Sequence, residues 1–183
     1  MLKYCIAFLF ILTIACGEKK SKKENVIFFQ GKDFFKTQLA DIKATPYFIY
    51  KIETKNGNRD SVAIPVDSVE YYMKPFVEPD INDPAIKDSY EESVIFDETT
   101  GIYSLNYTTA DKELEVQIMN VLLKEDAKTV KHIFIRKYKS AKEGSVIEQL
   151  SWKPYQSFES NRLIQSPNKP EETHKIQVVW NVK

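Results

Sequence analysis

The hydrophobic positions of this chain recur first at helical spacing. An apolar stripe with steps of three and four residues predicts an amphipathic helix over residues 33–43, with Asp33 as its N-cap. A second helix is expected after Asp67, because Glu70 stands three residues further on and completes a capping-box pattern, and Pro75 is expected to kink or end it. The expected stripes comprise Phe34, Phe35, Leu39 and Ile42 in the first helix and Val69, Tyr72, Met73 and Phe76 in the second.

Alternating apolar and polar positions then predict strands. Residues 48–52 and 62–66 alternate on either side of Asn56-Gly57, a pair that tolerates positive φ and favours a tight hairpin. After an acidic loop over residues 78–88, further strands are expected at short intervals. They cover residues 94–96, 102–109, 114–118, 130–138, 146–152 and 174–182, with a weaker and more polar run at 155–164.

This order of elements predicts an α+β fold. Consecutive strands joined by short turns pair antiparallel, so we expect one meander sheet of seven to nine strands with two N-terminal helices packed across its concave side. A sheet of that length twists and is expected to curl around the helices that cover it. The resulting half-barrel is similar in outline to the envelope carriers of the LolA and LolB type, a likeness that rests on element order and implies nothing about activity.

The first sixteen residues have the layout of a secretory signal. Lys3 forms a minimal positive region, residues 4–15 are almost all apolar, and the chain turns polar directly after Cys16. The apolar run is shorter than the ~20 residues that a membrane-spanning helix requires, so removal of this segment is the favoured interpretation.

Thr13-Ile14-Ala15-Cys16 resembles the bacterial lipobox, in which the cysteine is acylated and becomes the new N-terminus, although Thr13 stands where that family commonly has Leu. The resemblance implies a lipid-anchored protein of the bacterial cell envelope, and we expect it on the outer membrane, facing the periplasm. A plain signal peptide cut nearby and an uncut anchor are the alternatives. Two or more acyl chains suffice for stable attachment, so Cys16 would hold the protein at its membrane.

These features divide the chain into three parts. Residues 1–16 form the signal with Cys16 as anchor, residues 17–25 form a Lys-rich tether, and residues 26–183 form a single α+β domain. Both cysteines, Cys5 and Cys16, belong to the first part. The domain therefore has no disulfide and no thiolate, and its core alone must stabilise it.

Charge excludes one class of partner and suggests another. Residues 26–183 carry 21 basic and 24 acidic side chains, a net charge of −3, which is not typical of a nucleic-acid-binding protein. Basic residues nevertheless gather in and directly after the strand predicted over residues 130–138, where they could meet an anionic glycan or an acidic envelope protein. They are Lys131, Arg136, Lys137 and Lys139. The alternative is that these side chains are solvated and protect a strand edge from aggregation.

Catalytic and metal-binding patterns are scarce. The glycines are scattered singly, without a phosphate-binding loop or a nucleophile elbow, and we expect neither an enzyme nor a cofactor. His132 could face inward beside Phe134, but a lone strand histidine is usually bonded to a neighbour. Asp80 begins a calcium-loop register that fails at Pro84, so we expect Asp80 and Asp83 to cap turns instead, with no metal bound.

The middle of the chain carries a further resemblance. Asp80-Ile81-Asn82-Asp83-Pro84-Ala85, then Ser89-Tyr90 and the Tyr-rich residues 102–109, resemble a family of small uncharacterised lipoproteins of Bacteroidota-like bacteria. That family has no assigned activity to transfer. The expected function is therefore a non-catalytic binding or assembly module of unknown partner. The alternative is a carrier or sensor of an apolar ligand, held between sheet and helices by the many aromatic residues.

Overall fold

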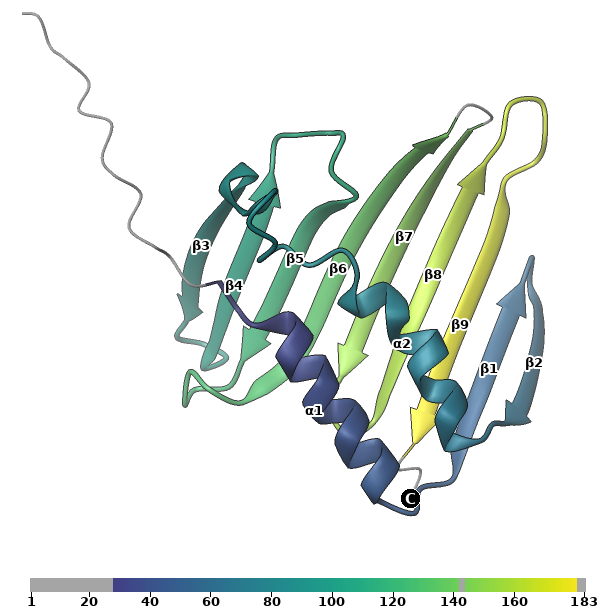
Figure 1. The fold of residues 1–183 in the computed structure, drawn as a ribbon, viewed down its shortest axis with the longest axis horizontal. Coiled ribbons are helices and arrows are strands. Elements are labelled where there is room, and N and C mark those ends of the chain that lie inside the picture. Colours follow the sequence, from purple (N-terminus) through teal and green to yellow (C-terminus); the bar gives the residue numbers. More distant parts are fainter. Residues whose placement is uncertain (1–27, 142–143, 181–183) are drawn as a thin grey trace, which may run out of the picture.

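The computed structural model describes residues 28–141 and 144–180. In these residues the chain forms two α-helices, two short 3-10 turns and nine strands (Figure 1). The helices are α1 (Gly31–Ala44) and α2 (Val69–Val77), and the 3-10 turns are η1 (Val66–Ser68) and η2 (Lys87–Ser89). The strands are β1 (Ile49–Lys55), β2 (Asn58–Ala63), β3 (Tyr90–Asp97), β4 (Ile102–Thr109), β5 (Val116–Leu123), β6 (Val130–Ala141), β7 (Gly144–Lys153), β8 (Ser157–Gln165) and β9 (Glu172–Trp180).

All nine strands belong to one antiparallel sheet, in the order β2-β1-β9-β8-β7-β6-β5-β4-β3. The prediction of an antiparallel meander with two helices is confirmed, and β3 to β9 follow one another in sequence order. The β1–β2 hairpin adds at the far side, against β9, because the connection through α2 crosses the whole sheet before β3 begins. The hairpin turn is the expected one, with positive φ at Asn56 and Gly57.

The expected half-barrel is wrong. The sheet is neither closed nor strongly curled, and β2 and β3 lie at its two opposite edges (Figure 1). Two helices of 14 and 9 residues cover only part of the sheet, and the edge strand β3 leaves Val94, Ile95 and Phe96 exposed instead of curling over the helices to bury them. The LolA/LolB-like outline is therefore not observed.

Both helices lie across the same face of the sheet (Figure 1), which we call the covered face; the opposite face is the open face. The predicted helix starts need correction. Asp33 lies inside the first turn of α1, and Gln30 is the N-cap, without a side-chain bond. Likewise Asp67 lies in η1, and Ser68 precedes α2, also without a side-chain cap bond. Pro75 is accommodated within α2, whose last residue is Val77.

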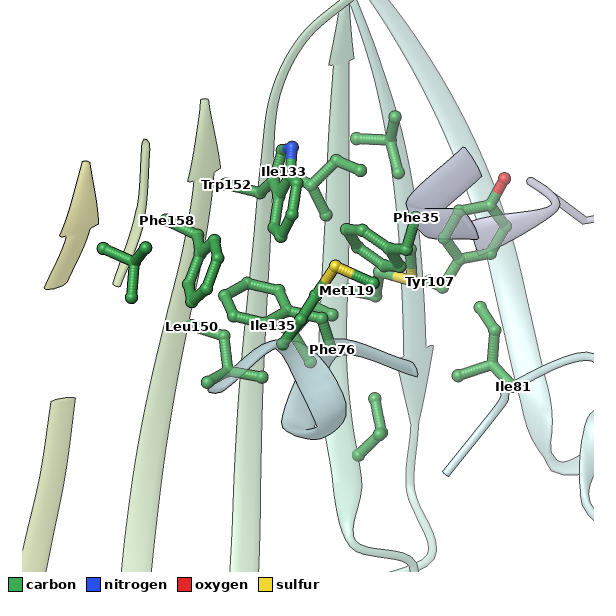
Figure 2. Close-up of a cluster of buried hydrophobic side chains, with 14 of the residues drawn as sticks. Phe35, Phe76, Ile81, Tyr107, Met119, Ile133, Ile135, Leu150, Trp152 and Phe158 are labelled. Atoms are coloured by element: carbon green, nitrogen blue, oxygen red, sulfur yellow. The ribbon is translucent and has the colours of Figure 1, made fainter. Parts of the chain in front are cut away.

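The core fills the space between the helices and the covered face (Figure 2). Trp152 on β7 lies at its centre, with Phe35 of α1 and Phe76 of α2 at ring distances of 5.1 and 5.2 Å. Phe158 of the neighbouring strand stacks on Trp152, with 4.9 Å between the ring centroids and 8° between the planes. Aromatic pairs of this geometry stabilise a core beyond the area they bury, and most of the aromatic residues are therefore structural.

Two register shifts decide which side chains reach the core. Between Val116 and Ile118 the pairing of β5 with β6 shifts, so that Val116 is buried on the covered face and Ile118 lies on the open face. A second shift, near Leu123, pairs Val130 with that covered-face residue and His132 with Leu122. A bulge of this kind inserts one residue into a strand and reverses the alternation beyond it.

Candidate functional site

The structure separates the four basic residues that the sequence suggested as a patch. Arg136 lies opposite Gln149 on the open face, whereas Lys137, next to it, points to the covered face. Lys139 has the same parity as Lys137 but is exposed, and Lys131 is exposed at the register shift in β6. The four side chains therefore do not form one surface, because neighbouring residues of a strand point to opposite faces.

Lys137 is buried and bonded inside the protein. Its side chain is 4% exposed, and its ammonium group lies 3.3 Å from a carboxylate oxygen of Glu115. The same group donates a hydrogen bond to the backbone carbonyl oxygen of Glu78. Burial lowers the pKa of Lys137 below its ordinary value, and the Glu115 carboxylate opposes that effect. Of the suggested patch, only Lys131, Arg136 and Lys139 remain at the surface.

Arg136 belongs to a polar open face that the strand register builds. Side chains opposite one another on neighbouring strands share a face and lie about 4.5–5.5 Å apart at Cβ. One row runs from β4 to β9 through Thr108, Ile118, Arg136, Gln149, Asn161 and Lys175. The next row runs through Asn106, Asn120, Phe134, Ser151, Glu159 and Gln177.

Two adjoining hollows lie along these rows. The first has a volume of about 340 Å³, and its lining includes Phe134, Arg136, Gln149, Ser151 and Asn161. The second has a volume of about 490 Å³. Its lining comprises Thr108, Thr109, Lys112, Gln117, Ile118, Arg136 and Tyr138. Ile118 and Arg136 line both hollows, so the two form one shallow groove across the strands with Arg136 at their junction.

The polar side chains of the groove differ in whether they are bonded within the protein. Arg136, Gln149 and Asn161 make no hydrogen bond or ion pair to another described residue through their side chains. Glu159, by contrast, holds the Lys175 ammonium group at 2.9 Å. The groove thus presents a guanidinium and two amides that are free to bond a ligand, beside one neutralised carboxylate.

His132 lies beside the groove and is bonded to a hydroxyl. Its Nε2 is 2.6 Å from Ser151 Oγ, and its ring stacks on Phe134 with 3.9 Å between centroids. Burial lowers the pKa of His132 below 6.5, and Lys153 acts in the same direction. In the described residues no carboxylate is hydrogen-bonded to the imidazole, so the pair lacks the third group that orients the base in a serine-hydrolase triad.

A smaller cleft opens on the covered face between α2 and strands β8 and β9. Its volume is about 200 Å³, and its walls include Tyr71, Tyr72 and Phe158. Arg162 borders it, with Nε held at 2.7 Å by the buried carboxylate of Glu148, which also accepts a bond from Ser160 Oγ. The cleft is below the usual range of ~300–1,000 Å³ for small-molecule sites. Deeper between α1 and the sheet, the free volume falls to about 20 Å³.

The acidic loop behaves as the turn prediction expects. Asp80 accepts a hydrogen bond from the backbone N–H of Asn82, and Asp83 accepts one from that of Ala85. The side chain of Asn82 bonds to the carbonyl oxygen of Phe29 and ties the loop to the start of α1. Within residues 28–141 and 144–180, no group of three or more His, Cys, Asp or Glu side chains is arranged to hold a metal ion.

Of the residues that line the groove, only Arg136 was a candidate site residue in the sequence; Gln149 and Asn161, its polar neighbours, were not predicted. Both residues alternate, along their strands, with apolar residues that the sequence predicts to be buried. This alternation was the signal that could have placed them on the open face. The alternation does not predict the pairing register of β6, β7 and β8, which places Gln149 and Asn161 beside Arg136. Cys16 and the tether over residues 17–25 lie outside the described residues.

Neither helix in the described part of the chain has the length and apolar character needed to cross a membrane. Comparison with protein families, with curated proteins and with solved structures gives no match to this chain.

Proposed function

We propose that this chain is a lipid-anchored lipoprotein of the bacterial cell envelope whose body is a non-catalytic binding or assembly module. The anchor rests on the lipobox-like Thr13-Ile14-Ala15-Cys16 and the apolar run before it. The middle of the chain, with its likeness to small lipoproteins of Bacteroidota-like bacteria, supports the same assignment. Outer-membrane attachment facing the periplasm is the location we propose.

The binding role rests on one observation: a groove on the open face in which the side chains of Arg136, Gln149 and Asn161 have no hydrogen-bond or ion-pair partner among residues 28–141 and 144–180. Here they converge in a hollow next to Phe134, which is 41% exposed. That combination of a hollow, free polar groups and an exposed ring is typical of a recognition surface.

The same packing argues against a carrier of an apolar ligand. Such a ligand would need a large cavity between the helices and the covered face, but Trp152 and its aromatic neighbours occupy that space. The α2 cleft, at about 200 Å³, is the feature that favours the carrier or sensor alternative, for a ligand of few atoms.

Mass spectrometry of the mature N-terminus tests the anchor. We expect two or three acyl chains on Cys16 in protein extracted from envelopes, and release of the Cys16→Ser variant from the membrane fraction. An unmodified thiol on protein that is already free of the membrane would contradict the anchor.

A photo-crosslinking amino acid in the intact, membrane-attached protein tests the binding face. Placed at Gln149, it should crosslink to an envelope component; placed at Lys36, an exposed residue of α1 on the other side of the sheet, it should not. Equal crosslinking from both positions, or none from Gln149, would count against the open face as the binding surface.

A further inference from the structure

The open face carries an uncompensated positive charge where its two hollows meet. Arg136 lines both hollows, and Lys112 lines the second; neither has an ion-pair partner among the described residues. The one carboxylate that lines the first hollow, Glu159, is neutralised by Lys175 at 2.9 Å. A ligand in this groove therefore meets net positive charge, although the domain as a whole is weakly acidic.

The arrangement along β6 alternates aromatic rings with this charge. Phe134, Arg136 and Tyr138 occupy successive open-face positions, about 6.7 Å apart at ~3.3–3.4 Å per residue. The two rings are 41% and 37% exposed. A guanidinium between two exposed rings can bind an anionic group while the rings pack against the apolar faces of adjoining units of the same ligand.

The remaining lining suits hydroxyl groups. Gln149 and Asn161 each offer both a donor and an acceptor, and so does a sugar hydroxyl. The groove crosses the sheet from Thr108 on β4 to Asn161 on β8, four strand spacings or roughly 19 Å at ~4.8 Å each. That distance is enough for a short oligosaccharide lying across the strands.

We propose that this groove binds an anionic glycan, a linear chain of sugars that carries carboxylate or phosphate groups. The inference rests on the proposed function and names the partner class of the same face. Arg and aromatic residues are common in protein interfaces, but the buried centre of such an interface is mostly apolar. The amides of Gln149 and Asn161 line the centre of this groove beside Arg136, so a protein partner fits less well. Charge complementarity with Arg136 and Lys112 selects an anionic rather than a neutral glycan.

Calorimetric titration of the full-length protein in detergent, at low salt, tests the inference. The probe is an oligogalacturonate, which carries one carboxylate per sugar, with a neutral oligogalactoside of equal length and a polyphosphate of equal charge as comparisons. We expect the oligogalacturonate to bind at least about tenfold more tightly than either comparison ligand.

Matched variants then locate the site. Arg136→Gln should weaken binding of the oligogalacturonate by about tenfold, the loss expected for one charge-assisted hydrogen bond, and Phe134→Ala should weaken it by a few-fold. Lys139→Gln removes the same charge from the same strand, but from the covered-face parity, and should change the affinity less than twofold. An unchanged melting temperature in each variant shows that the fold is intact.

Three results would overturn the glycan assignment. They are equal losses in Arg136→Gln and Lys139→Gln, polyphosphate binding as tight as that of the glycan with no effect of Phe134→Ala, and absence of oligogalacturonate binding. None of these three results would contradict the proposed function, provided that Cys16 is acylated and that a crosslinker at Gln149 captures an envelope protein. Conversely, the protein could bind oligogalacturonate, with the expected losses of affinity in the variants, and yet lack acylation. That result would support the groove as a glycan site and contradict the lipid anchor.

Discussion

Lys137 on β6 donates a hydrogen bond to the backbone carbonyl oxygen of Glu78, 59 residues earlier and directly after α2. The carbonyl groups at a helix C-terminus lack partners within the helix and carry partial negative charge, so a buried cation stabilises that end. The same ammonium group pairs with Glu115. One side chain thus fixes the end of α2 against the sheet, which explains why a lysine is buried on the covered face.

Replacing Lys137 should therefore destabilise the protein. Lys137→Ala removes a charge-assisted bond and leaves the Glu78 carbonyl unsatisfied, so we expect the free energy of unfolding to fall by about 1.5–3 kcal/mol. Lys139→Ala, an exposed position on the same strand, should change it by less than about 0.5 kcal/mol. Denaturant titration measures both, and a similar small effect of the two variants would show that the Glu78 bond contributes little.

The aromatic core offers a second prediction. Phe76 is 4% exposed and contacts Phe35, Trp152 and Phe158, so Phe76→Ala leaves a large cavity and should lower the free energy of unfolding by about 3–5 kcal/mol. Phe48 is 84% exposed, and Phe48→Ala should cost less than about 0.5 kcal/mol. The same denaturant titration compares them, and a mild Phe76→Ala variant would argue that α2 packs loosely.

Two glycines at positive φ allow the cost of backbone strain alone to be compared with the cost of strain plus a steric conflict. At Gly57, φ is +85° and a Cβ atom would meet nothing within 4 Å, so Gly57→Ala should cost only the strain of the left-handed region, about 1–2 kcal/mol. At Gly144, φ is +137° and a Cβ atom would lie 2.0 Å from the carbonyl oxygen of Gln165. Gly144→Ala must therefore shift β7 away from β8 and should lower the melting temperature more than Gly57→Ala does. Equal melting temperatures would contradict the close approach at Gly144.

Much of the fold follows from local patterns in the sequence. The alternation along residues 102–109 and the Asn56-Gly57 turn require only neighbouring residues, and both were predicted correctly. The helix caps at Asp33 and Asp67 were not, because each helix begins at a different residue, and no side-chain cap bond forms at either N-cap. Capping patterns are short and recur by chance, so they are weaker guides than a repeated apolar stripe.

The open-face groove depends on information that no local pattern holds. The shift between Val116 and Ile118 decides that Ile118 lies beside Arg136 instead of in the core. Bulges of this kind depend on pairing between strands, and the sequence pattern of a single strand does not reveal them. The basic cluster was visible in sequence for the same reason that it was misleading: adjacent residues such as Arg136 and Lys137 look like one patch but point to opposite faces.

The lowered pKa of His132 predicts the direction in which the free energy of unfolding changes with pH. In the folded state burial disfavours the imidazolium form, whereas the unfolded chain titrates at about 6.5. At pH values well above 6.5 both states are neutral, and His132 contributes no pH dependence. As the pH falls from 6.5 toward the lower folded pKa, the unfolded chain binds a proton that the folded protein does not, so stability should decrease.

His132→Gln tests this directly, because the amide can still bond Ser151 Oγ but does not titrate. The difference in free energy of unfolding between wild type and variant should be constant above pH 7 and should shift against the wild type between pH 6.5 and 5. An NMR titration of the His132 ring should place its midpoint below 6.5. A difference that stays constant from pH 7.5 to 5, or a ring that titrates above 6.5, would mean that the imidazole is more solvated than its contacts with Phe134 and Ser151 indicate.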